Sequence, residues 1–405
     1  MDTVIRDKAL ELINASVWNT AVPELNSEQA EAVYQIFKSH AILALPEKVL
    51  PQIPSLSDDL RKKWRNDIVH IIQSNYLITT VENEIISILD SQSIRFVIIK
   101  GTSAARYYPS PDLRALGDID IVVNPEDFDK ACGVVLNSGS IEKTDQMDII
   151  MGRHRCFQKN NVEIEIHRFF ALPENSATLE KLDRQLIKGI NSTHRLESII
   201  DGLILLEHIN QHFFEGIGLR HILDWMMFAN KCLNKENWPE YIKGAESVGL
   251  AKLAESLSSM CEIYLGLKPQ YEFNRVNAQI CEELLDYILL SGNFGSSPEW
   301  RKNSTSRFIS KHRNPVEFFK FLQVRGLETW KNSDKHKFLK HFAWVYQSGL
   351  MLKNYFSRDH SDFRLNKSIS NLMNTSMLFS EVGVSHSSLE KSKFDADEYV
   401  KSISN

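Results

Sequence analysis

The stretch from residue 96 to residue 123 constrains the possible fold more than any other part of this sequence. It starts with Phe96–Ile99, an apolar, β-branched run of strand length that Lys100 and Gly101 end. A segment compatible with a short helix follows, and two prolines stop it. The composition of Asp118–Val123 predicts a second strand. The stretch therefore predicts a strand, a glycine turn, a short helix and another strand.

Acidic side chains share one face of this second strand. Side chains alternate along a strand, so Asp118 and Asp120 lie on one face and the isoleucines that follow them lie on the other. Two neighbouring carboxylates repel each other and are costly to desolvate, and a bound cation relieves both effects. Their oxygens suit Mg²⁺ or Mn²⁺. The run Val162–His167 also alternates with strand period and supplies a third carboxylate, Glu165, so the pattern predicts a two-metal site.

The glycine turn after the first strand predicts a binding site for an anion. Lys100 precedes the glycine and Ser103 lies just inside the expected helix, where free backbone N–H groups and the helix dipole favour phosphate. Arg114 lies four residues before Asp118, on the loop that leads into the second strand. Lys100 and Arg114 are therefore candidates to neutralise the charge of a triphosphate.

Together these motifs resemble a known enzyme superfamily. A glycine turn with serine, Asp-x-Asp on the next strand and a later single carboxylate are similar to the nucleotidyltransferase superfamily of DNA polymerase beta. The fuller string of Lys-Gly, Tyr-Pro, Arg-x-x-Gly-Asp-Ile-Asp and later Glu-Ile-His resembles the bacterial family of uncharacterised nucleotidyltransferases, closely from 95 to 168 and loosely to about 356. The resemblance implies an α+β fold, with a small mixed β-sheet core flanked by N-terminal and larger C-terminal helical regions.

The resemblance also implies an activity and a set of site residues. Asp118, Asp120 and Glu165 would hold Mg²⁺ or Mn²⁺ and catalyse transfer of a nucleoside monophosphate from a nucleoside triphosphate, such as ATP, to a hydroxyl acceptor, with release of pyrophosphate. The residues that it places at the nucleotide are Lys100, Gly101, Thr102, Ser103, Arg114 and Gly117. The acceptor is unknown, and we favour a small molecule or a protein side chain over RNA.

Two other functions remain open. Basic residues alternate with aromatic ones between 301 and 340, and such a composition can bind single-stranded nucleic acid, as a tRNA- or RNA-directed, toxin-like nucleotidyltransferase requires. The same composition is more typical of a core helix with a basic outer face. The third possibility is a catalytically inactive module that binds a nucleotide or a partner, because folds of this kind also persist as scaffolds.

A second group of polar residues follows in the predicted helical region. His208 and His212 are four residues apart and share a helix face, as do Arg220 and Asp224 on the next expected helix. Three interpretations stay open: a zinc site, histidines and an Arg–Asp pair that brace packed helices, and contact with the nucleotide or the acceptor. We favour bracing. His167, at the end of the third strand, is likewise either structural or an acceptor contact.

Several local elements can also be predicted. Ser27 has the character of an N-cap, and a long amphipathic helix is predicted from Leu56 to Leu89. Trp64 lies there among basic residues, and a core tryptophan is favoured over an RNA contact. A helix is predicted from about 124 to 137, and Asn160–Asn161 is the predicted turn of a hairpin.

Composition limits the class of protein. A net charge of −5 argues against a general nucleic-acid coat protein. The five cysteines are scattered, which is typical of a reducing cytoplasm, and no run approaches the ~20 apolar residues of a membrane span. The sequence therefore predicts a cytoplasmic protein without membrane segments. Its expected regions are an N-terminal helical region (1–92), a catalytic core (93–172), a C-terminal helical domain (173–381) and a polar tail (382–405).

Overall fold

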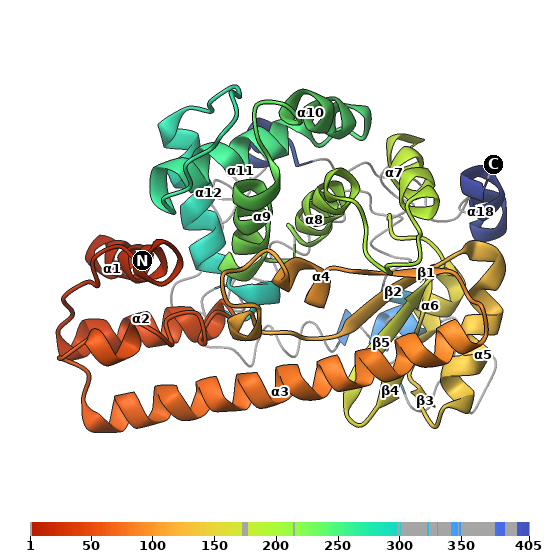
Figure 1. The fold of residues 1–405 in the computed structure, drawn as a ribbon, viewed down its shortest axis with the longest axis horizontal. Coiled ribbons are helices and arrows are strands. Elements are labelled where there is room, and N and C mark those ends of the chain that lie inside the picture. The colour runs from red at the N-terminus through yellow and green to blue at the C-terminus, as the bar shows by residue number, and fades with distance from the viewer. Residues whose placement is uncertain are drawn as a thin grey trace. The chain divides into compact units, whose positions relative to one another are not determined.

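A computed structural model gives the architecture of the chain (Figure 1). It describes residues 2–171, 177–213, 215–297 and 300, and shorter pieces at 322–323, 330, 342–346, 348–349, 377–384 and 395–404. Contacts group Met1–Trp300 with Phe379–Asn405 in one unit and Arg301–Leu378 in a second. The elements named below belong to the first unit. The basic, aromatic stretch from 301 to 340 falls almost wholly outside the described residues, so an RNA surface there stays a prediction.

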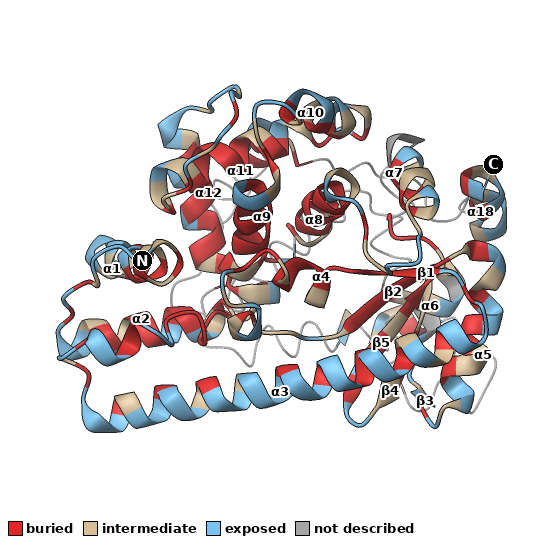
Figure 2. Cartoon of the chain, in the orientation of Figure 1, coloured by how far each residue is buried: buried red, intermediate tan, exposed pale blue. Residues whose placement is uncertain are grey.

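Helices come first along the chain. They are α1 (Thr3–Trp18), α2 (Ser27–Ser39) and α3 (Asp58–Ser91). Asn26 and Gln29 form a capping box at the start of α2, so the cap lies one residue before the predicted Ser27. The long helix α3 runs along the bottom of Figure 1, and Figure 2 shows buried and exposed residues alternating around it. Trp64 is buried and its Nε1 donates to the Leu43 carbonyl at 2.8 Å, so it is a core residue, as favoured from the sequence.

One mixed sheet forms the centre of the described fold. Its strands are β1 (Phe96–Ile99), β2 (Ile119–Val123), β3 (Ile141–Glu142), β4 (His154–Lys159) and β5 (Val162–His167). They lie in the order β1-β2-β5-β4-β3, in which β2 and β5 are parallel and the other neighbours antiparallel. Asn160 and Asn161 join β4 to β5 with φ values of 52° and 64°, the left-handed backbone that a two-residue hairpin turn needs. The predicted hairpin is confirmed.

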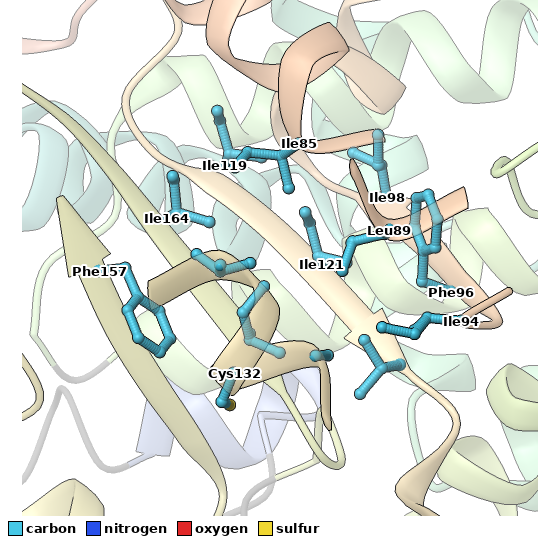
Figure 3. Close-up of a cluster of buried hydrophobic side chains, with 14 of the residues drawn as sticks. Ile85, Leu89, Ile94, Phe96, Ile98, Ile119, Ile121, Cys132, Phe157 and Ile164 are labelled. Carbon is cyan, nitrogen blue, oxygen red and sulfur yellow. The ribbon is translucent and has the colours of Figure 1, made fainter. Parts of the chain in front are cut away.

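One face of the sheet is apolar and packs against α3 and α5 (Phe128–Asn137) (Figure 3). Ile119 and Ile121 of β2 meet Ile85 of α3 and Ile164 of β5 in this core. Burying a side chain of this size stabilises the fold by about 1.5–3 kcal/mol. Because successive residues of a strand face opposite sides, the acidic residues of β2 and β5 lie on the other face. The apolar core thereby fixes the direction in which the carboxylates point.

Further helices follow the sheet. They are α7 (Ala177–Lys188), α8 (Ser198–His212), α9 (Leu219–Cys232), α10 (Trp238–Ser247), α11 (Ala251–Tyr264), α12 (Ala278–Ser291) and α18 (Ala396–Ser404). The short elements are α4 (Gly101–Ala105), α6 (Gln146–Met151) and the 3₁₀ turns η1 (Leu50–Gln52), η2 (Pro111–Leu113), η3 (Pro125–Asp127) and η5 (Asn293–Gly295). The predicted α+β class is confirmed. None of the helices in the described ranges has the length and apolar character that crossing a membrane needs.

Candidate active site

Three carboxylates meet beside the two paired inner strands β2 and β5. Parallel pairing sets Asp120 of β2 opposite Glu165 of β5, and Asp118 lies one residue before β2 begins. One carboxylate oxygen from each of the three residues lies within 4.8 Å of the other two. The structure thus brings together the predicted metal ligands. Three hard oxygen donors at this spacing fit a divalent ion such as Mg²⁺ or Mn²⁺.

Two basic side chains contact the same carboxylates. Lys100 Nζ lies 2.6 Å from Asp120 Oδ1. His167 Nε2 lies 2.9 Å from the same oxygen and 3.1 Å from Glu165 Oε2. Lys100 reaches this position from a backbone with φ 52° and ψ −134°, a conformation that costs a non-glycine residue roughly 1–3 kcal/mol. The fold therefore tolerates strain where it aims an ammonium group at the carboxylates.

The pKa values of these groups follow from their mutual charges. The charge of Asp120, and then burial, raise the pKa of Asp118 above its ordinary value. Burial acts to raise the pKa of Asp120, but the charge of Lys100 and the hydrogen bond from His167 lower it overall. Burial acts to lower the pKa of Lys100, and the carboxylates raise it overall. At neutral pH the site therefore holds a charged lysine beside negatively charged carboxylates.

The hydroxyl groups of the glycine turn contact buried carboxylates. Thr102 Oγ1 donates to Glu82, with oxygens at 2.6 and 2.8 Å, and Ser103 Oγ lies 3.4 and 3.5 Å from the oxygens of Asp201. Helix α4 has only five residues, so its dipole is small, although its first amides have no intrahelical acceptor. A Cβ at Gly101 would lie 3.4 Å from the Asp118 carbonyl, so the turn and the start of β2 are in close contact. These contacts anchor the turn, and its role toward phosphate stays a prediction.

Arg114 pairs with a carboxylate of α9. It forms a two-point contact with Asp224, with Nη2 2.5 Å from Oδ2 and Nε 3.1 Å from Oδ1. The Tyr108 hydroxyl donates to the same carboxylate at 2.8 Å. The expected pairing of Asp224 with Arg220 is not found among the described residues, where Arg114 and Tyr108 contact Asp224 instead. Arg114 is buried and ties the loop before β2 to α9.

Arg220 lies beside the start of β2. Its Nη1 donates to the Ala115 carbonyl at 3.3 Å and is 4.0 Å from the position of a Cβ at Gly117. Its Nε is buried and has no hydrogen-bond partner among the described residues. Arg220 thus faces the segment that leads to Asp118, which sequence spacing alone does not reveal.

The histidines of α8 and α9 form one cluster. The ring centres of His208 and His212 are 4.8 Å apart, and that of His221 is 5.0 Å from His208. Phe294 lies against this group, 4.8 Å from His212 and 5.0 Å from His221. Within the described ranges, His208 and His212 join no group of three histidine, cysteine or acidic ligands close enough to share a metal ion. The geometry therefore gives the zinc interpretation no support.

Some residues that hold the site were not identified from the sequence. Glu82 and Asp201 are buried carboxylates that anchor the glycine turn, and His221 completes the histidine cluster. Glu82 could have been noticed in the sequence, because it is an acidic residue among the regularly spaced apolar residues of α3. No comparable sequence pattern identifies which polar residue of α8 contacts Ser103.

Comparison with known proteins agrees with this geometry. Residues 26–266, more than half of the 405 residues, match a family described as "Uncharacterised nucleotidyltransferase". This segment contains the whole sheet, the three carboxylates and helices α7 to α11. No curated protein and no solved structure matches the chain. The chain belongs to this family of uncharacterised nucleotidyltransferases.

Proposed function

We propose that this protein transfers a nucleoside monophosphate from a nucleoside triphosphate to a hydroxyl acceptor and releases pyrophosphate. The observation that carries the proposal is the convergence of Asp118, Asp120 and Glu165, whose oxygens lie within 4.8 Å of one another. These residues would hold Mg²⁺ or Mn²⁺. A bound divalent ion would polarise the α-phosphate and make the acceptor hydroxyl easier to deprotonate.

The protein's own cations have separate tasks in this proposal. Lys100 is buried beside Asp120, and its ammonium group can balance the charge of an incoming triphosphate. His167 bridges Asp120 and Glu165, so it holds two ligands on neighbouring strands in one orientation. Neither residue needs to move for the carboxylates to remain close together. These contacts support the proposal of a site that takes a cation and an anion.

A small molecule or a protein side chain is the acceptor that we propose, with ATP as the first nucleotide to test. The net charge of −5 disfavours general binding to RNA. The RNA-directed alternative depends on residues 301–340 and so has no support from the described contacts. A catalytically inactive module is the remaining alternative, and it predicts nucleotide binding without transfer.

Label transfer tests the proposal directly. The purified protein is incubated with each of four α-labelled nucleoside triphosphates, Mg²⁺ and cell extract, and the label is followed into small-molecule, protein and RNA fractions. We expect label in the small-molecule or protein fraction, together with pyrophosphate. Label in RNA alone would favour the RNA-directed enzyme. Binding of nucleotide with no label in any fraction would favour the inactive module.

A further inference from the structure

The basic cluster beside the carboxylates has no role in the function proposed so far. It consists of Arg220 and His221 on α9 and His208 and His212 on α8, with Phe294 against them. Arg220 and His221 lie in the first turn of α9, which contains no acidic residue. Helix dipoles disfavour cations at this end and favour anions. Arg220 therefore carries its positive charge where a helix on its own is least able to accept it.

His221 is the strongest sign of a missing ligand. Its side chain is 1% exposed, and neither ring nitrogen meets the geometry of a hydrogen bond to a described residue, although the Gly218 carbonyl lies close enough to act on the ring. Burial and the charge of Arg220 hold the pKa of His221 well below its ordinary value, although the Gly218 carbonyl acts in the opposite direction. A buried polar group without a partner costs about 1–3 kcal/mol. A ligand that accepts a hydrogen bond from His221 removes this cost.

Arg220 adds to the cluster a charge that has no direct ion-pair partner among the described residues. Arg106, Arg114 and Arg195 each contact a buried carboxylate, but Arg220 forms no ion pair among the described residues. Burial and the neighbouring Arg114 lower its pKa, yet a guanidinium stays protonated in proteins. The Phe294 ring lies 5.7 Å from the guanidinium carbon, and an apolar neighbour strengthens any ionic contact made there.

The cluster approaches the carboxylates through Arg220. Arg220 lies against Gly117, the residue before Asp118. The charge of Lys100 contributes to lowering the pKa of His208, after burial. The ammonium group that contacts Asp120 therefore also affects the pKa of His208. Arg220 and the histidines packed near it thus lie next to the carboxylates of the proposed active site.

We propose that Arg220 and His221, with His208, form a polyphosphate subsite that takes the β- and γ-phosphates of the nucleoside triphosphate. The assignment rests on the proposed function. In it, Arg220 performs the task predicted for Arg114, whose charge Asp224 already neutralises. The same phosphate chemistry could belong to a phosphorylated acceptor, so the test separates these two sources.

Binding measurements on the full chain test the subsite. Calorimetry compares ATP, inorganic pyrophosphate and adenosine, each with Mg²⁺, for wild type, Arg220→Gln and Arg220→Lys. The matched control is Arg275→Gln, which removes an exposed arginine that pairs with Glu262. Melting curves verify that each variant is folded, and His221→Asn serves as a second probe if Arg220→Gln is unstable.

We expect Arg220→Gln to weaken ATP and pyrophosphate binding about tenfold or more, which corresponds to roughly 1.4 kcal/mol. Arg220→Lys should recover part of this loss, and Arg275→Gln should bind as wild type does. Adenosine should bind weakly to every variant. Unchanged ATP and pyrophosphate binding in a folded Arg220→Gln protein would overturn the proposal.

Two further outcomes would each overturn part of the proposal. Loss of pyrophosphate binding with unchanged ATP binding would overturn the assignment to the nucleotide and favour a phosphate of the acceptor. An equal loss for adenosine and ATP would overturn phosphate recognition. The proposed function can fail while the subsite is correct. If ATP binding depends on Arg220 but no fraction receives label, the phosphate subsite is supported and the nucleotidyl transfer activity is not.

Discussion

The His167 imidazole lies between two carboxylates of neighbouring strands, with Nε2 2.9 Å from Asp120 Oδ1 and 3.1 Å from Glu165 Oε2. Burial acts to lower the pKa of His167, but hydrogen bonds to both carboxylates raise it above its ordinary value. Lys100 contacts the same Asp120 oxygen. The protein thus supplies positive charge to a carboxylate site on two sides, which keeps three acidic groups close together in a largely buried position.

Replacement of His167 by Gln should destabilise the protein and make its stability more dependent on metal. The substitution removes a bridging donor from Asp120 and Glu165, a loss worth about 1–3 kcal/mol or a few degrees of melting temperature. Mg²⁺ should raise the melting temperature of the variant more than that of wild type. Melting curves with Mg²⁺ and with chelator measure both effects.

His70→Gln is the control for that change, since His70 is exposed on α3. It should melt as wild type does in both conditions. If Mg²⁺ shifts neither wild type nor His167→Gln, the carboxylates do not hold a metal ion as proposed.

Asp224→Asn should be strongly destabilising. The change leaves Arg114 buried without a charged partner, and breaking a buried ion pair from one side costs about 3–5 kcal/mol. In a unit of this size the expected loss is about 4–7 °C in melting temperature. Thermal unfolding at neutral pH provides the measurement.

Glu262→Gln tests whether burial causes that loss. It breaks the contact of Glu262 with Arg275 on the surface and should leave melting nearly unchanged. Equal effects of the two substitutions would show that the Arg114–Asp224 pair does not brace the fold.

His40 should make stability depend on pH. Burial lowers its pKa from 6.5 to about 4. Between these two pH values His40 is protonated in the unfolded chain and neutral in the folded chain. Stability is therefore complete above about pH 6.5 and falls as the pH drops toward 4, by about 2 kcal/mol at pH 5. His40→Asn can still accept the Leu219 amide bond that His40 Nδ1 accepts at 3.1 Å.

Denaturant unfolding of wild type and His40→Asn between pH 7.5 and 5 isolates this contribution, because other groups titrate equally in both. The difference in unfolding free energy should shift in favour of the variant as the pH falls. A difference that stays constant would mean that folding does not change the pKa of His40.

The strand pattern was sufficient to predict the carboxylate site. Alternation placed Asp118 and Asp120 on one face of their strand and Glu165 on one face of a later strand, and the register of β2 and β5 brings the three together. The hairpin turn was predictable because Asn160 and Asn161 are residues that accept the left-handed backbone.

Contacts between distant parts of the chain could not be predicted. Arg114 and Asp224 are 110 positions apart, and helical spacing offered Arg220 as a nearer partner for the same carboxylate. The hydroxyl of Ser103 was expected at phosphate, but it meets Asp201 of α8, 98 positions later. Which distant residues contact each other depends on how the helices pack on the sheet, and local sequence patterns do not determine that packing.

The most direct test of the central claim is the rate of label transfer by Asp118→Asn in Mg²⁺, with Asp286→Asn as control. Asp286 is an exposed carboxylate on α12, so the control makes the same chemical change away from the site. We expect Asp118→Asn to lose transfer by about 100-fold or more while melting, without metal, at the same or a higher temperature, because repulsion from Asp120 is relieved. Asp286→Asn should transfer label as wild type does. Turnover of Asp118→Asn near the wild-type rate would contradict the account.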